Sequence, residues 1–218
     1  MKYGEITDLI ARIPDGSLVT SDNRWDKNFL LMLLDAGRAA WLVDTYKKDK
    51  FLPAICYQKY YPEFSIPLQP KDKCFAKFLM PDIVRLDEHS DGIRYVGSDD
   101  YNGDQTNNFD RVQSRAWLST YNKHPVMNTE SVFSYLFDAS SGILELRGKA
   151  SFVKTPLTEC LFMHPTQVAG FNKDIDDYPI TMDGVYAVEK MIFQADTRIA
   201  SATEPKLAFS PASTPIKK

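Results

Sequence analysis

The chain has 218 residues, of which 44% are hydrophobic and 25% are charged, and these values are ordinary for a folded globular protein. Its formal charge of −3, with both signs interspersed, argues against a dedicated nucleic-acid binder, which needs Lys and Arg clustered on one face. Three cysteines without a close pair, Cys56, Cys74 and Cys160, indicate reduced thiols and no disulfide framework.

A short amphipathic helix is predicted over Tyr3–Ile13. Its aliphatic residues recur at helical spacing: Ile6, Leu9, Ile10 and Ile13. The Pro-Asp-Gly sequence at 14–16 is expected to end it. Because polar and acidic residues occur from the second residue onward, we expect no secretory signal at this end.

A long helix is predicted over Ser21–Lys48, where the side-chain oxygens of Ser21-Asp22-Asn23 suit an N-cap. One apolar stripe along it consists of Trp25, Phe29, Met32, Ala36, Ala40 and Val43. A second stripe, on another face, consists of Leu30, Leu34 and Trp41, with Leu31 and Leu42 less regularly placed. The longest apolar run, Phe29–Leu34, is too short to span a bilayer, so no membrane partner is expected.

The second stripe is the main candidate interaction surface. One small core cannot satisfy a helix that is apolar on two faces, so this face should meet another element or another subunit. The predicted subunit-interface residues on the helix are Leu30, Leu34, Arg38 and Trp41. The alternative, in which both stripes are internal core, stays open. Arg38 lies in a patch of small residues at 36–40 and will need an acidic or carbonyl partner if it is buried.

Between Leu52 and Val168 the hydrophobic pattern changes from helical to alternating. The segments predicted as strands are Ile55–Tyr61, Cys74–Met80, Ile83–Asp87, Ile93–Gly97, Val112–Tyr121, Val132–Phe137, Ile143–Arg147 and Thr158–Met163. Turn signals separate several of them: Asp91-Gly92, Asn102-Gly103 and Ser141-Gly142. Short strands at this spacing predict an antiparallel sheet, sandwich or small barrel.

A second strong helix is predicted over Thr181–Ala200, with Pro179 before it and Thr181 as its cap. Its narrow apolar stripe consists of Val185, Val188, Ile192, Ala195 and Ile199. We expect this stripe to pack against the helix at Ser21–Lys48. The predicted fold class is therefore α+β, with N-terminal and C-terminal helices forming a helical layer, a long antiparallel β-rich insertion between them, and an extended C-terminal arm.

The predicted division of the chain has four parts. Residues 1–50 form an N-terminal helical part, 51–170 a β-rich insertion domain, 171–200 the C-terminal helix, and 201–218 an extended tail rich in Pro, Ser and Thr. Within an assembly such a tail could lie across a neighbour. Its predicted interface residues are Pro205, Phe209 and Pro211.

Motifs for catalysis or for a cofactor are absent from the sequence. It contains no GxxxxGK(S/T) or GxGxxG phosphate loop, no GxSxG elbow and no HExxH pair. The acidic loop at 98–104 lacks the acidic residue that an EF-hand needs at its twelfth position, where Phe109 stands. We therefore predict a protein that is not an enzyme, with no catalytic residue, no cofactor and no metal.

Two other functions stay open on the residues alone. One is a small cytosolic hydrolase with its site in the β-rich region. Its candidate residues are Cys160 with His124 or His164, or the pair Asp99 and Asp100. The other is a β-module that binds carbohydrate or peptide through an exposed aromatic strip. Its candidate residues are Tyr57, Tyr60, Tyr61, Trp117 and Tyr121.

Three segments carry a family resemblance: a Ser/Asp-capped helix from Ser21-Asp22 through Arg38 to Tyr46-Lys47-Lys48, a strand at Ile55-Cys56-Tyr57-Gln58, and Asp177-Tyr178-Pro179-Ile180 at the start of an amphipathic helix. In this order, with a short helix before them and a β-domain between the last two, the chain resembles a virion protein family of tailed bacteriophages. The members in question belong to the crAss-like podoviruses that infect gut Bacteroidetes.

This resemblance implies a head–tail connector, an adaptor or ring protein that docks under the portal and helps to form the DNA exit channel. Such rings are cyclic homo-oligomers, commonly of about twelve subunits. The implied partners are copies of the chain, the portal, neighbouring tail ring proteins, and DNA that passes through the lumen without sequence-specific binding. The implied location is the virion, at the head–tail interface, after synthesis in the host cytoplasm.

Overall fold

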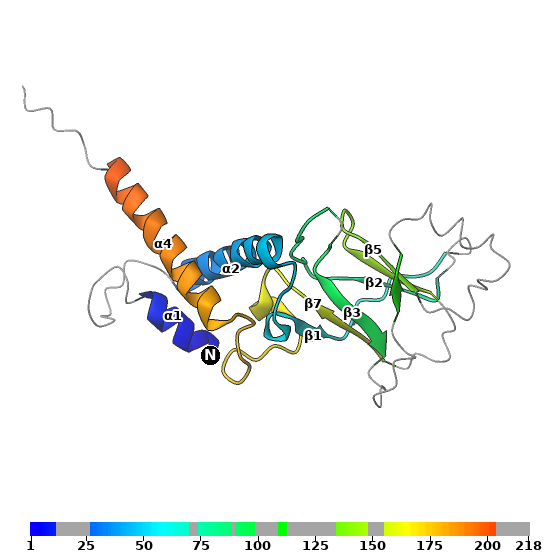
Figure 1. Cartoon of the computed structure of the whole chain (residues 1–218). Helices are drawn as coiled ribbons and strands as arrows, with labels where there is room; N and C mark the ends of the chain where they lie inside the picture. Colours follow the sequence, from blue (N-terminus) through cyan, green and yellow to red (C-terminus); the bar gives the residue numbers. More distant parts are fainter. Residues whose placement is uncertain are drawn as a thin grey trace, which may run out of the picture.

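Helices lie at one end of the molecule and strands at the other, which confirms the predicted α+β class (Figure 1). The structure is a computed structural model that describes residues 1–11, 27–69, 74–88, 90–98, 109–112, 134–147 and 155–203. Within those ranges, no helix combines the length and the apolar character that a membrane span requires.

Three α-helices are found in the described part of the chain: α1 (Tyr3–Ala11), α2 (Lys27–Asp49) and α4 (Met182–Thr203). The predicted start of the long helix at 21–26 lies outside the described residues. α2 ends where Lys50 adopts a positive φ of 53° and its amide donates to the Tyr46 carbonyl at 2.9 Å. The hydroxyl oxygen of Thr181 accepts the Gly184 amide at 3.2 Å, which confirms the predicted cap of α4.

The C-terminal helix is longer than predicted, because it ends at Thr203 and not at Ala200. Pro205 follows closely, and a proline disfavours helical backbone at the residue before it. The rest of the predicted arm, with its interface residues Pro205, Phe209 and Pro211, lies outside the described residues.

The described strands form two sheets. The first is antiparallel, in the order β1 (Gln58–Tyr60), β7 (Pro156–Cys160) and β3 (Ile93–Ser98). The second has the order β2 (Ala76–Leu79), β6 (Ile143–Arg147), β5 (Ser134–Asp138) and β4 (Asp110–Arg111). Because β4 runs parallel to β5, this sheet is mixed, whereas the sequence predicted antiparallel pairing throughout.

Glycines form two of the predicted turns. Gly142 has a φ of +66° in the hairpin between β5 and β6, and Gly92 has a φ of +69° before β3. A Cβ on Gly92 would lie 2.3 Å from the carbonyl oxygen of Val84, so only glycine fits there. The third predicted turn, Asn102-Gly103, lies outside the described residues.

Two predicted strands are corrected. The segment Ile83–Asp87 forms a single isolated bridge, from Ile83 to Phe162, because it then turns so that the Ser90 carbonyl accepts the Leu86 amide at 3.0 Å. The segment predicted at 55–61 begins as a 3-10 helix, η1 (Ala54–Cys56), and only then continues as β1. A second 3-10 helix, η4 (Pro165–Gln167), follows β7. Most of the strand predicted at 112–121 lies outside the described residues.

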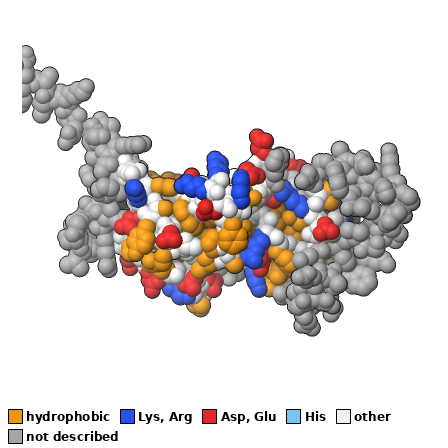
Figure 2. All heavy atoms as spheres, in the orientation of Figure 1, with side chains coloured by type: hydrophobic (Ala, Val, Ile, Leu, Met, Phe, Trp, Pro, Cys, Tyr) orange, Lys and Arg blue, Asp and Glu red, His pale blue; other side chains and the backbone are white. Residues whose placement is uncertain are grey.

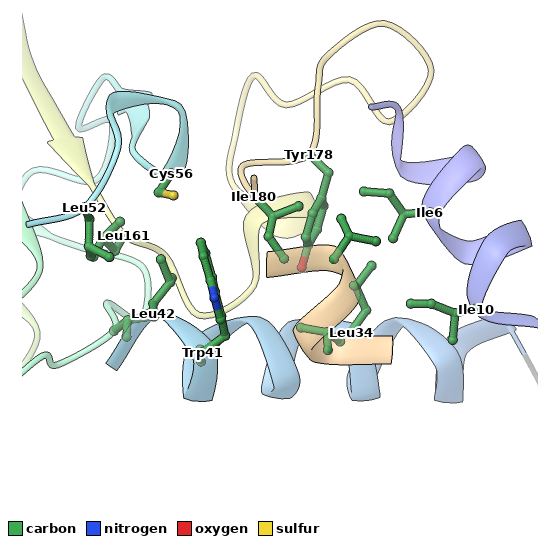
Figure 3. Close-up of a cluster of buried hydrophobic side chains, with 14 of the residues drawn as sticks. Ile6, Ile10, Leu34, Trp41, Leu42, Leu52, Cys56, Leu161, Tyr178 and Ile180 are labelled. Atoms are coloured by element: carbon green, nitrogen blue, oxygen red, sulfur yellow. The ribbon is translucent and has the colours of Figure 1, made fainter. Parts of the chain in front are cut away.

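Apolar side chains form two main clusters. The helical cluster joins α1, α2 and α4 with residues of the β-rich part such as Leu52, Cys56 and Leu161 (Figure 3). The sheet cluster draws on both sheets, as in a sandwich, and includes the rings of Tyr60 and Phe162 in an edge contact at 5.5 Å. The helical cluster therefore crosses the boundary near residue 51, and the division into domains stays a prediction.

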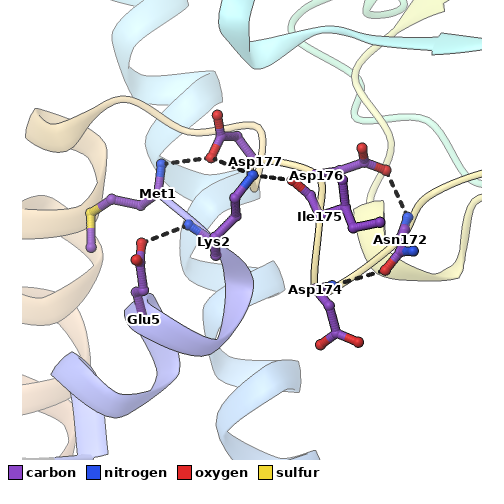
Figure 4. A network of polar contacts seen from close by, with 8 residues as sticks. All are labelled: Met1, Lys2, Glu5, Asn172, Asp174, Ile175, Asp176 and Asp177. Carbon is purple, nitrogen blue, oxygen red and sulfur yellow. Dashed lines mark hydrogen bonds and ion pairs between the residues drawn. The ribbon is translucent and has the colours of Figure 1, made fainter.

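A polar network fixes α1 to the segment that leads into α4 (Figure 4). The Met1 ammonium lies 3.2 Å from Oδ1 of Asp177, and Nζ of Lys2 donates to the Ile175 carbonyl. The Tyr178 amide donates to the Met1 carbonyl at 3.0 Å. These contacts place α1 beside α2 and close the helical cluster on that side.

Candidate interaction site on the helical layer

A fully buried arginine on α2 connects the helical layer to the segments around it. The guanidinium of Arg38 donates to three backbone carbonyls: Cys56 at 3.0 Å, Phe162 at 2.8 Å and Pro179 at 2.7 Å. Burial lowers the pKa of Arg38, an effect that Tyr178, Cys56 and Asp35 oppose. The sequence-based expectation that a buried Arg38 would need carbonyl or acidic partners is confirmed.

Asp35, one turn before Arg38, is the second buried charge of this site. Its Oδ1 accepts the Tyr178 hydroxyl at 2.6 Å, and its Oδ2 lies 3.0 Å from Nδ1 of His164, whose ring is partly exposed. Burial first, and the Asp35 carboxylate second, raise the pKa of Tyr178 well above its usual value, so the hydroxyl remains a donor. Asp35, Tyr178 and His164 therefore reinforce the junction that Arg38 forms.

Glycines allow α2 and α4 to approach closely at this junction. A Cβ on Gly37 would lie 2.8 Å from Cγ1 of Val188, and a Cβ on Gly184 would lie 2.9 Å from Cζ3 of Trp41. Val188 of α4 therefore packs over Gly37 of α2, and Trp41 of α2 packs over Gly184 of α4. This confirms the predicted packing against the long N-terminal helix for Val185, Val188 and Ile192. The side chains of Ala195 and Ile199, which complete the predicted stripe, lie outside the described ones.

The residues predicted for a subunit interface on α2 are corrected. The side chains of Leu30, Leu34, Arg38 and Trp41 are all buried within the chain, three of them in the helical cluster. Side chains that one chain buries offer no surface to another. For these four residues the alternative interpretation is correct: they belong to the interior of the chain and not to a subunit interface.

The other apolar stripe of α2 is the one that faces outward. Phe29 and Met32 are 43% and 53% exposed, and Ala36 and Ala40 are exposed further along the same face. Val43, one turn later, is partly buried. The helix is therefore apolar on two faces, as predicted, and its exposed face is the first stripe, not the one predicted as the interaction surface.

The exposed face of α2 continues into an open groove of about 650 Å³. Ala36, Ala39, Ala40 and Val43 form its α2 side, and Ile83, Val84, Arg85 and Met163 form the other side, with Asp44 and Lys47 at the end. The wall is fixed by backbone hydrogen bonds, from the Val84 amide to the Leu161 carbonyl at 2.7 Å and from the Met163 amide to the Asp82 carbonyl at 2.8 Å. The groove is thus a preformed, mainly apolar depression.

Cys160, the predicted nucleophile of the alternative hydrolase, is fully buried at the end of β7. Burial raises the pKa of its thiol to about 12, and a protonated, inaccessible thiol is a poor nucleophile. His164 is turned toward Asp35, and His124, Asp99 and Asp100 lie outside the described residues. Across the described ranges, no group of three or more His, Cys, Asp or Glu side chains could hold a metal ion.

The tyrosines of the alternative β-module do not form a common exposed strip. Tyr60 is buried against Phe162, Tyr57 is partly buried below the guanidinium of Arg94, and Tyr61 is 42% exposed. Trp117 and Tyr121 lie outside the described residues. On the face drawn in Figure 2, basic and acidic side chains of the described residues are intermixed among apolar ones.

The grouping of Asp35 with Tyr178 and His164 was missed by the sequence reasoning, which named His164 only as a candidate partner of Cys160. Asp35 is separated from His164 by 129 positions and from Tyr178 by 143 positions, so no local pattern brings them together. A usable signal was the acidic Asp35 inside an otherwise apolar helical segment, since a buried carboxylate requires donors.

No protein-family model matches this chain, and no curated protein matches it at a significant level.

Proposed function

We propose that the chain is a non-enzymatic structural protein that acts through protein–protein contacts, as a head–tail connector or ring subunit of a tailed bacteriophage virion. The observation that carries this proposal is the exposed apolar face of α2, which includes Phe29, Met32 and Ala40 and continues into the groove. Contiguous exposed apolar surface on a folded protein is typical of an interaction site.

The helical layer is suited to present this face rigidly. Arg38 links α2 to three separate segments, and Asp35 adds bonds to Tyr178 and His164. A surface on a preorganised element loses little conformational entropy when it binds, so more of the burial energy remains as affinity. A stable interface of standard size buries about 800 Å² per partner. Apolar burial contributes roughly 25 cal/mol per Å², from which the entropy lost on association must be subtracted.

The connector role specifically is supported by the resemblance of the capped helix, the strand and the Asp177–Ile180 segment, and by the overall charge. In a connector ring, DNA slides through the lumen and should not be gripped by phosphate-binding clusters. A formal charge of −3 with intermixed signs suits that requirement. The proposed partners are copies of the chain, the portal and neighbouring ring proteins of the tail, within the virion.

Light scattering coupled to size exclusion tests this proposal. The full chain is measured over a wide concentration range, alone and with the portal protein of the same virus, and the particles are imaged by negative-stain electron microscopy. We expect a discrete oligomer of ring shape, formed by the chain alone or on the portal. A monomer under every condition, with no binding to the portal, would contradict the proposal.

A further inference from the structure

The second helix of the layer carries an exposed ridge. Met182 and Tyr186, which are 47% and 57% exposed, lie in one row of α4 at a spacing of four residues. These are large side chains that protrude from a well-anchored helix. They contrast with the alanines that form one side of the groove on α2.

The ridge cannot reach the groove of its own chain. The buried row of α4 consists of Val185, Val188 and Ile192, which face α2 and the helical cluster. At about 100° per residue, Met182 lies about 90° and Tyr186 about 130° around α4 from the middle of that row, so the ridge lies on the flank and outer side of the helix. Within the described residues, Met182 and Tyr186 stay about half exposed, which leaves this ridge available to a second molecule.

We propose that the α4 ridge of one copy docks in the α2 groove of a second copy. Rows of large side chains on one helix pack into the channels between small side chains on another. Here the alanines at 36, 39 and 40 give a helix close access, and Ile83 and Met163 flank it. Met182 and Tyr186 are the anchors that fill the groove, and an aromatic anchor of this type buries about 150–250 Å².

Charge favours the same pairing. Lys47 and Arg85 line the groove, while the nearby Asp44 is already paired with Lys48 at 2.6 Å. The groove therefore presents net positive charge beside its apolar surface. The ridge begins at the first turn of α4 with Asp183, an exposed carboxylate next to Met182. Asp183 of one copy thus complements Lys47 of the next.

This contact joins two different surfaces, so it is heterologous. Each copy keeps one free ridge or one free groove after it has bound a neighbour, and repetition of the contact closes into a ring when the rotation permits. The inference rests on the proposed function and deepens it, because it names the two faces by which ring subunits join.

Two single variants and their mixture test the pairing. Ala40→Glu places a carboxylate in the groove and leaves the ridge intact, whereas Tyr186→Glu does the reverse. Each should weaken self-association by about tenfold or more, because docking would bury an unpaired charge. An equimolar mixture should form a discrete heterodimer, since one intact groove and one intact ridge remain. Phe64→Glu, at an exposed apolar residue near β2, is the matched control and should leave the oligomer unchanged.

Masses from light scattering separate the outcomes, and circular dichroism melting confirms that each variant is folded. Three outcomes would overturn the pairing while the ring function stands. In the first, both variants still form oligomers; in the second, only one variant loses self-association. In the third, both variants are monomeric but their mixture forms no heterodimer. A wild-type chain that never associates with itself, alone or on the portal, and that does not bind the portal would overturn both the pairing and the proposed function.

A charge reversal provides a second test. Lys47→Glu should weaken self-association, because the carboxylate introduced at position 47 of one copy would repel that of Asp183 on the next. Adding Asp183→Lys in the same chain should restore the association. Equal weakening by the single and the double variant would overturn the predicted contact between these two residues.

Discussion

The helical end and the sheet end of this molecule bury polar groups in different ways. At the helical end, the guanidinium of Arg38 and the carboxylate of Asp35 are both bonded to specific partners from distant segments. At the sheet end, the buried carboxylates of Glu145 and Asp91 are paired with arginines, at 3.0 Å and 2.9 Å. Other buried atoms there have no hydrogen-bond partner in the described structure: Oδ1 of Asp91, Oγ of Ser98 and Nε of Arg147.

The reason lies in how the two kinds of element satisfy their backbones. Strands pair through backbone hydrogen bonds, as β7 does with both β1 and β3, so the backbone itself sets their register. An α-helix satisfies its backbone internally, and only side chains can fix its position against its neighbours. The helical layer should therefore depend on a few side chains, and single substitutions there should have large effects.

The largest expected effect is that of Arg38→Met. It removes the donors of three buried carbonyls, at Cys56, Phe162 and Pro179, and should lower the free energy of unfolding by about 3–5 kcal/mol. Urea denaturation followed by circular dichroism measures the change. Arg85→Met, at an exposed position, should stay within about 0.5 kcal/mol. A loss below about 1 kcal/mol for Arg38→Met would show that the carbonyls are readily satisfied by water.

A pair of adjacent residues separates the core face of α2 from its exposed face. Trp41 packs over Gly184, so Trp41→Ala should leave a cavity and reduce stability by about 3 kcal/mol. Ala40→Glu, one residue earlier on the exposed face, should change stability by no more than about 0.5 kcal/mol while it lowers the mass of the oligomer. Melting and light scattering on both variants give the comparison. Equal destabilisation by the two would mean that the Ala40 face is also core.

Local patterns in the sequence were sufficient to predict the helices and their pairing. The spacing of Val185, Val188 and Ile192 predicted the contact between α4 and α2, and glycine predicted the turns at 92 and 142. These features depend on periodicity and on backbone geometry, which are local properties. The need of Arg38 for carbonyl partners was likewise predictable, since a buried guanidinium has few alternatives.

The sequence could not decide which apolar stripe of α2 is core. Both stripes contain large apolar residues at helical spacing, for example Leu34 on one and Met32 on the other. The choice is made by what lies opposite: α1, α4 and the segment around Tyr178 all cover the Leu34 side. The segment around Tyr178 and α4 are separated from α2 by the β-rich part, and the placement of all three elements is a tertiary property that periodicity does not encode.

A different kind of effect is expected at alkaline pH, and it distinguishes the two ends again. Burial raises the pKa of Cys56 at the helical end to about 11 and that of Cys160 at the sheet end to about 12. A thiol with a raised folded pKa contributes stability that is present below its unfolded pKa of about 9 and is lost as the pH rises through the folded value. Stability should therefore fall above pH 9, by at most about 1.4 kcal/mol per pH unit for each thiol.

Urea midpoints at a series of pH values between about 8 and 12 measure this loss. Cys160→Ala should make the fall shallower up to about pH 12, whereas Cys56→Ala should do so only up to about pH 11. Identical profiles for the wild type and both variants would show that neither thiol stays protonated in the folded chain.

The smallest effect concerns the start of α4, where the helical layer depends on one side-chain oxygen. The Thr181 hydroxyl caps the Gly184 amide, so Thr181→Ala should reduce stability by about 1 kcal/mol, and Thr181→Ser should restore most of it. The cap belongs to the first turn of α4, which carries Met182 and leads to Tyr186 one turn later, so its loss should loosen the start of the ridge. Thr181→Ala should therefore weaken self-association more than its effect on urea stability alone accounts for. If mass and stability decline in proportion, the cap supports the fold and has no separate influence on the ridge.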